Sequence, residues 1–173
     1  MKKAHLAIGI MALSLVSHVR SENQTYRRAE MEAAPMFESA IRDAKEITLL
    51  VFDPHSRFDK KKPGDRVFES SGISGSWLIA KELTIKDRAK QALLGTSLRA
   101  GIEQFDDGVP ACFEPRHGIR VIVGGKEVTF MICFQCSQAY VNGFPKCSGF
   151  LVNPKAGSIW DGVFQDCGLK TIR

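Results

Sequence analysis

The sequence predicts an α+β fold, an antiparallel sheet of about five strands with helices packed on one face. Segments rich in β-branched and aromatic residues outnumber the amphipathic helical segments, and the later ones follow one another without a helix between them. The chain then ends in a strongly amphipathic helical segment. Strands and helices do not alternate regularly and no glycine-rich phosphate loop of standard spacing occurs, which argues against the nucleotide-binding folds.

The N-terminus has the pattern of a cleavable signal peptide. Lys2 and Lys3 form a charged start, and an apolar run follows over residues 6–16. This run is shorter than the roughly 20 residues of a membrane-spanning helix. We therefore expect a signal peptide over residues 1–21, cleaved after Ser21, no membrane span, and a periplasmic or secreted protein.

The full chain carries a formal net charge of +5, most of which belongs to the predicted signal peptide. That segment contains Lys2, Lys3 and Arg20 and no acid, which leaves 21 basic and 19 acidic residues, a net charge of +2. A charge this close to neutral gives no reason to expect nucleic acid as a partner. The identity of any partner stays open, and another exported protein is one candidate.

The predicted mature chain has the length of one domain of ordinary size. The polar, weakly patterned residues 22–34 are expected to form a loose N-terminal arm, and residues 35–173 a single globular domain. Within that domain, residues 53–75 are rich in Gly, Pro, Ser, Lys and Asp, which predicts a mobile loop with a short extended piece around Val67 and Phe68.

Each expected element has a local signal. Pro35 at a first turn predicts a helix over residues 35–44, and Asp87 as an N-cap predicts a second helix that reaches Ile102. The strands expected from β-branched and aromatic content cover residues 46–52, 77–86, 119–123 and 127–134, with short pieces around 138–141 and 150–152.

The last part of the chain has the clearest turn and cap signals. Gly124 and Gly125 join two expected strands and are the two-residue signature of a tight hairpin. Asn153 as an N-cap, followed by Pro154, predicts a C-terminal helix that Gly168 ends.

The residues that most plainly carry chemistry are three cysteines and a histidine. The register counted from the Gly-Gly turn places Arg116 opposite Cys133. Cys112 and His117 are therefore expected near both Cys133 and Cys136.

Three kinds of site suit this neighbourhood. In an oxidising compartment a disulfide would join Cys112 to Cys133 or Cys136. A zinc site formed by Cys112, His117, Cys133 and Cys136 would match the Cys₃His ligand set. A redox or nucleophilic thiol is the third, with His117 or Arg116 lowering the pKa of a cysteine in this set.

Two further cysteines lie outside this cluster. Cys167 falls on the apolar face of the C-terminal helix, so we expect it to be buried. A bond between Cys147 and Cys167 would require the loop after Pro145 to fold back onto that helix.

The pattern Cys-Phe-x-Pro-Arg-His-x-Ile, then a hairpin, then Cys-Phe-x-Cys resembles that of a loosely defined group of small bacterial proteins of unknown function. The resemblance covers roughly residues 77–141. It implies a shared core for this region and brings no activity, cofactor or catalytic role with it.

Two classes of function follow as hypotheses. The first is an exported non-catalytic domain that binds or protects another molecule, with the cysteines and histidine as its structural centre. The alternative is an enzyme that uses the same cluster, either a thiol-dependent disulfide oxidoreductase or a metal-assisted hydrolase. The predicted mature chain has only His55 and His117, which excludes a histidine-rich metal site.

Overall fold

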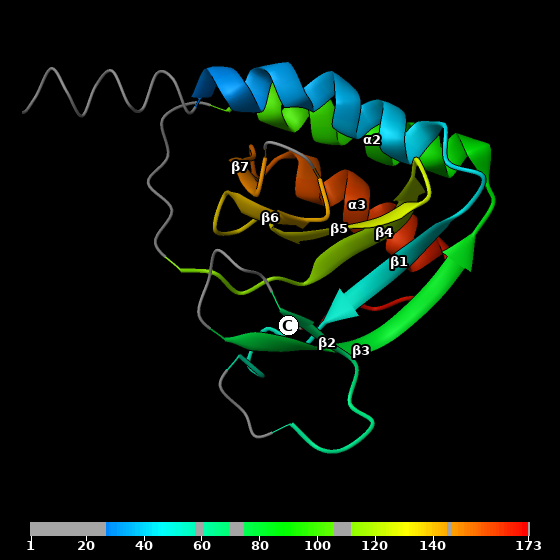
Figure 1. Ribbon diagram of the computed structural model, residues 1–173, viewed down its shortest axis with the longest axis vertical. Helices are drawn as coiled ribbons and strands as arrows, with labels where there is room; N and C mark the ends of the chain where they lie inside the picture. Colours follow the sequence, from blue (N-terminus) through cyan, green and yellow to red (C-terminus); the bar gives the residue numbers. More distant parts are fainter. Residues whose placement is uncertain (1–26, 58–60, 70–74, 106–111, 145–146, 173) are drawn as a thin grey trace, which may run out of the picture.

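The computed structural model describes residues 27–57, 61–69, 75–105, 112–144 and 147–172, and these form an α+β fold (Figure 1). Seven strands make one curled antiparallel sheet in the order β2-β3-β1-β4-β5-β6-β7. The strands are β1 (Ile47–Phe52), β2 (Val67–Glu69), β3 (Ser76–Ile85), β4 (His117–Val123), β5 (Lys126–Cys133), β6 (Gln138–Asn142) and β7 (Gly149–Leu151). The helices are an N-terminal helix over residues 27–42, α2 (Arg88–Glu103) and α3 (Ala156–Asp166).

The α+β class is confirmed, whereas the expected number of about five strands is wrong. The short extended piece expected around Val67 and Phe68 is the strand β2, whose Phe68 pairs with Trp77 of β3. A strand of three residues is too short for an alternating pattern to be recognised, and β2 lies within the polar segment expected to be a loop. Residues 58–60 and 70–74 of that segment lie outside the described residues, so its mobility stays a prediction.

The N-terminal arm is a second correction, because residues 27–34 of it belong to a helix. Pro35 lies inside this helix and does not begin it. Glu30 is only 1% exposed and holds the helix against the sheet, since its carboxylate accepts a hydrogen bond from the Leu151 backbone N–H at 2.9 Å. Arg27 adds an ion pair to Glu30 at 2.8 Å. Residues 1–26, which include the expected signal peptide, lie outside the described residues.

The predicted hairpin is confirmed together with its register. Val123 pairs with Lys126 across the turn, and the ladder continues to His117 opposite Ile132. Gly124 and Gly125 have φ angles of 56° and 77°, the left-handed conformations that a tight two-residue turn of this kind requires.

Of the two N-caps predicted from the sequence, Asp87 and Asn153, only the first is confirmed. The Asp87 carboxylate caps α2 as expected, accepting hydrogen bonds from the backbone N–H groups of Ala89 and Lys90 at 3.0 and 3.1 Å. The C-terminal helix starts later than expected, at Ala156. Asn153 instead accepts a hydrogen bond from the Lys155 N–H at 3.0 Å, in a turn that precedes the helix.

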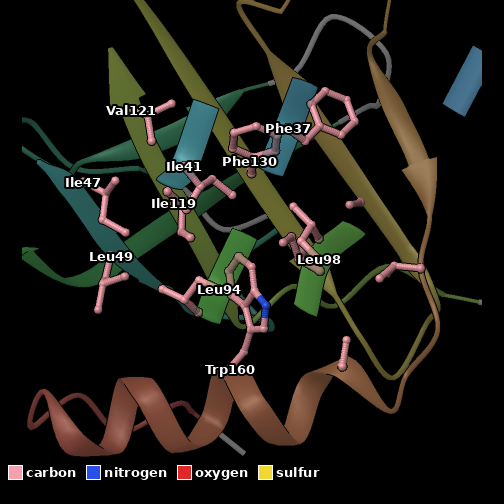
Figure 2. Close-up of a cluster of buried hydrophobic side chains, with 14 of the residues drawn as sticks. Phe37, Ile41, Ile47, Leu49, Leu94, Leu98, Ile119, Val121, Phe130 and Trp160 are labelled. Carbon is pink, nitrogen blue, oxygen red and sulfur yellow. The ribbon is translucent and has the colours of Figure 1, made fainter. Parts of the chain in front are cut away.

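Side chains alternate between the two faces of the sheet, and each face buries its own cluster. The helix-side core joins one face to all three helices, and Figure 2 shows Trp160 of α3 reaching into it beside Leu94 of α2. The other face holds the smaller cysteine-side cluster, which comprises Leu50, Phe52, Phe68, Trp77, Phe113, Met131, Cys133 and Cys136. Among the described residues, no helix has the length and apolar character needed to cross a membrane.

Candidate functional site

The cysteine-side cluster contains a disulfide between Cys133 and Cys136. Cys133 ends β5, and the chain then turns so that the two Cα atoms lie 5.2 Å apart. The turn is closed by a hydrogen bond from the Ser137 N–H to the Phe134 carbonyl at 3.1 Å, with Ser137 in the left-handed region at φ 53°. This pairing corrects the expectation that Cys112 would bond to one of the two.

Cys112 is nevertheless in contact with the disulfide. Its Sγ lies 3.3 Å from Sγ of Cys136, and the Cys112 residue is exposed and unbonded. The predicted neighbourhood of the three cysteines is therefore confirmed, because the ladder ends at His117 opposite Ile132 and the segment before it lies against the disulfide turn, where the Glu114 N–H donates to Sγ of Cys136.

Each sulfur of the disulfide faces a backbone N–H group. The Cys136 N–H donates to Sγ of Cys133 at 3.2 Å, and the Glu114 N–H donates to Sγ of Cys136 at 3.4 Å. A hydrogen bond to sulfur becomes stronger when the sulfur is a thiolate. Either cysteine could therefore hold the negative charge that appears when the disulfide opens.

Aromatic side chains belong to the same buried cluster as the disulfide. The Phe113 ring meets those of Trp77 and Tyr140 with centroids 5.4 and 4.7 Å apart. Cys133 and Cys136 are 2% and 4% exposed. Of the three sulfurs, that of Cys112 belongs to the residue most open to solvent.

His117 lies away from the cysteines, on the helix side of the sheet. It pairs with Ile132, whose side chain is in the helix-side core, whereas Cys133 is the next residue and points to the opposite face. The imidazole packs against the rings of Phe134 and Phe164 at 5.5 and 5.0 Å. The alternation of side chains along the strand would have revealed this separation in the sequence.

The zinc site expected from Cys112, His117, Cys133 and Cys136 is therefore not assembled. Within the described residues, no group of three or more histidine, cysteine, aspartate or glutamate side chains could hold a metal ion.

The partner of His117 is Asp161 of α3. Nε2 of the imidazole lies 2.9 Å from Oδ1 of the carboxylate. Burial lowers the pKa of His117, and the neighbouring Asp161 charge opposes that shift without cancelling it. The folded protein thus favours a neutral imidazole that donates its Nε2 proton to the carboxylate.

A cavity of about 540 Å³ opens beside this pair. Its wall combines residues from the disulfide turn, the segment before β4, α3 and the C-terminal end of the chain. They are Glu114, Arg116, His117, Cys133, Phe134, Gln135, Pro154, Gly157, Ser158, Asp161 and Thr171. The sequence analysis did not single out Gln135 or Asp161. Gln135 could have been noted because it lies between two cysteines. Asp161 could not, because its place in the wall depends on how α3 packs against the sheet.

Arg116 ties three parts of this wall together. Its Nε donates to the Ile172 carbonyl at 2.8 Å, and Nη1 donates to Oε1 of Gln135 at 2.5 Å. Nη2 lies 4.0 Å from the Glu114 carboxylate and makes no hydrogen bond to a described residue. Arg116 thus connects the cavity wall to the turn between Cys133 and Cys136.

Cys147 and Cys167 are both unbonded thiols in the structure. Cys147 donates a hydrogen bond to the Gly149 carbonyl at 3.1 Å, and burial raises the pKa of both thiols. Cys167 is half-buried, not buried as expected, because it caps the end of α3 after the last full turn. His55 is exposed.

Comparison of the chain with protein-family models, with curated proteins and with solved structures finds no match. The resemblance across residues 77–141 therefore stays a prediction.

Proposed function

We propose that this chain is an exported thiol–disulfide exchange protein, with the Cys133–Cys136 disulfide as its exchanging bond. One observation carries the proposal. Cys112, an exposed thiol, has its Sγ 3.3 Å from Sγ of Cys136, which is contact distance for attack on that disulfide.

The exchange itself conserves electrons. The Cys112 thiolate attacks Sγ of Cys136, a bond between Cys112 and Cys136 forms, and the Cys133–Cys136 bond breaks. The electron pair of the broken bond stays on Cys133 as a thiolate. That thiolate accepts the hydrogen bond from the Cys136 N–H, which already points at Sγ of Cys133.

This exchange brings one end of a buried disulfide to the surface. Cys133 and Cys136 are nearly inaccessible, whereas Cys112 is exposed. An external thiolate can attack Cys112 in the rearranged disulfide and form a mixed disulfide with it. Cys136 then leaves as a thiolate to which the Glu114 N–H donates. A partner dithiol would complete the transfer by closing its own disulfide.

The burial of the disulfide favours a second candidate. Cys133 and Cys136 pack among aromatic rings, as a structural bond would in an exported domain that only binds or protects another molecule. In that case Cys112 would be a bystander. The two candidates differ in whether Cys112 controls the opening of the disulfide.

The deciding experiment uses the chain from residue 22 onward, produced in an oxidising compartment. Disulfide opening by dithiothreitol is followed by acid quenching, alkylation and peptide mass mapping. Replacing Cys112 with Ser should slow opening by about tenfold or more, because the surface route is lost. The Cys147→Ser variant removes another unbonded thiol outside the site and should open at the wild-type rate.

A second variant tests the internal exchange directly. With Cys133→Ser, the structure predicts a bond between Cys112 and Cys136 in the oxidised protein. An unchanged opening rate in Cys112→Ser, together with free thiols at Cys112 and Cys136 in Cys133→Ser, would overturn the proposal. Stoichiometric zinc in the purified wild type, with all three thiols reduced, would overturn it as well.

A further inference from the structure

A groove of about 570 Å³ lies between the end of the N-terminal helix and the tip of the β4–β5 hairpin, which are neighbours in Figure 1. Met36 and Ala40 of the helix form one wall, Ile122 and Val123 of β4 form the other, and Phe144 also lines it. A second hollow of about 350 Å³ adjoins the first, since Val123 and Phe144 line both. The two hollows together are called the hairpin groove below.

The hairpin groove is where exposed apolar side chains gather. Met36, Ile122 and Val123 are 51%, 60% and 37% exposed, and they are three of the seven exposed large apolar side chains among the described residues. The other four are spread over four different elements. Single exposed apolar residues are normal on a protein surface, whereas a gathered patch with a polar rim is typical of an interface.

The same patch contains a projection as well as a hollow. The turn at Gly124 and Gly125 is the tip of the hairpin, and a Cβ on either glycine would meet no atom within 4 Å. The tip therefore projects into open space next to the groove that it helps to line. A twofold axis beside the tip would place the tip of each copy in the groove of the other, and would bury the same patch on both copies.

The charges at the rim suit this pairing of two copies. Asp43 lines the groove on the side of the N-terminal helix, and Lys126 lines it on the side of the hairpin. Asp43 accepts two hydrogen bonds from Arg42 at 2.8 Å, yet its side chain stays 61% exposed. Lys126 is exposed and has no ion pair with a described residue. In a twofold pair, Lys126 of each copy would face Asp43 of the other, which fixes the register of the interface.

We propose that the hairpin groove is the interface of a homodimer in which each copy places its hairpin tip in the groove of the other. A second copy fits this surface because the projection, the hollow and both rim charges lie on one patch, as a twofold interface requires. The inference is independent of the proposed function, since no residue of the cysteine-side cluster lines the groove.

The first test measures the mass of the chain from residue 22 onward by analytical ultracentrifugation, on material free of intermolecular disulfides. The wild type should have the mass of two chains at high concentration and dissociate on dilution. Ile122→Glu should be monomeric at the same concentrations, because the dimer would bury its charge. Met36→Glu tests the opposite wall in the same way. Leu93→Glu is the control, since Leu93 is 48% exposed on α2, outside the groove, and the dimer should persist.

A reversal of charge tests how the two copies are arranged. Lys126→Glu and Asp43→Lys each place like charges opposite one another at both contacts, so each should weaken association about tenfold or more. Mixing the two variants should restore the wild-type affinity, because opposite charges face each other at both contacts of the mixed dimer. Lys81→Glu is the control, since Lys81 is exposed on β3 and does not line the groove.

Three results would overturn the proposal. One is a wild type that stays monomeric up to its solubility limit. Another is a dimer that persists in both Ile122→Glu and Met36→Glu, or charge variants that associate no better mixed than alone. The third is protection of Met36 from hydroxyl-radical oxidation in the dilute monomer, since another part of the same chain would then cover the groove. The exchange function would stand in each case, because the opening of the disulfide is measured on the single chain.

Discussion

The two faces of the sheet bury their apolar side chains by different means. The helix-side core is closed by three helices, and the indole N–H of its buried Trp160 donates to Oγ of Ser97 at 3.1 Å. The cysteine-side cluster has no helix over it among the described residues. It is closed by the three-residue strand β2, by the segment that carries Cys112 and Phe113, and by a disulfide.

This difference assigns most of the stability to one face of the sheet and the reactive groups to the other. A helix covers a sheet face with a continuous apolar stripe, and the resulting core leaves little room for a reactive group to meet solvent. A short strand and an irregular segment cover less, so a thiol such as Cys112 can be exposed while it still contacts buried sulfur. We expect the helix side to dominate the free energy of unfolding and the cysteine side to carry the reaction.

The largest expected effect tests that division. Trp160→Ala should lower the free energy of unfolding by about 3 to 5 kcal/mol, because it leaves a large cavity in the helix-side core. Phe68→Ala, on the edge strand of the cysteine side, should cost clearly less, since its ring contact is with Phe52 alone among the described aromatic rings. Urea denaturation of both variants measures the difference. Equal losses would contradict the comparison.

A smaller effect is expected where the cysteine-side cluster meets the β4 backbone. A Cβ at Gly118 would lie 2.5 Å from the Phe52 ring and 2.6 Å from the Phe130 carbonyl oxygen. Gly118→Ala should therefore destabilise the protein by about 1 to 3 kcal/mol through overpacking.

Gly162→Ala is the matched control for that substitution. Gly162 lies in α3, its Cβ would meet no atom within 4 Å, and helix propensity favours Ala by up to about 1 kcal/mol. Thermal melts should move in opposite directions for the two variants. A stabilised Gly118→Ala would show that the cluster tolerates more volume than the structure indicates.

The smallest expected effect concerns His117 and pH. Burial lowers the pKa of His117 in the folded protein, so below about pH 6.5 the unfolded chain binds the proton more readily. Stability contributed by the neutral imidazole is therefore present above that pH and is lost as the pH falls toward the folded pKa. His117→Gln, which can still donate to Asp161, should show a shallower loss between pH 7 and 5 in urea denaturation. Identical slopes would contradict the assignment of a buried neutral imidazole.

The parts of the fold that were predictable depend on neighbours in the sequence. The Asp87 cap and the Gly124-Gly125 turn each involve residues within a few positions of one another, so local backbone preferences were enough. The strand β2 could be predicted only as a short extended piece around Val67 and Phe68, because three residues carry no periodicity and its pairing with β3 depends on distant residues.

The sequence predicted which residues of the candidate site lie close together, but it did not predict which of them are bonded. The hairpin register brought Cys112 close to Cys136, as counting from the turn had indicated. Which cysteines bond depends on the left-handed turn at Ser137, and whether His117 joins them depends on which face of the sheet it occupies. The pairing of His117 with Asp161 has no counterpart in the sequence, since it arises only when α3 packs across the sheet.

By itself, the sequence determined the α+β class, the hairpin with its register and the gathering of three cysteines at one end of it. These follow from side-chain periodicity and from turn residues with few allowed conformations, which act over short stretches of chain. The tertiary structure alone decided that the N-terminal helix closes the helix-side core, that His117 pairs with Asp161, and that a cavity opens beside this pair. Those features require segments far apart in the chain to meet, and the burial that stabilises such meetings depends on the whole assembled core.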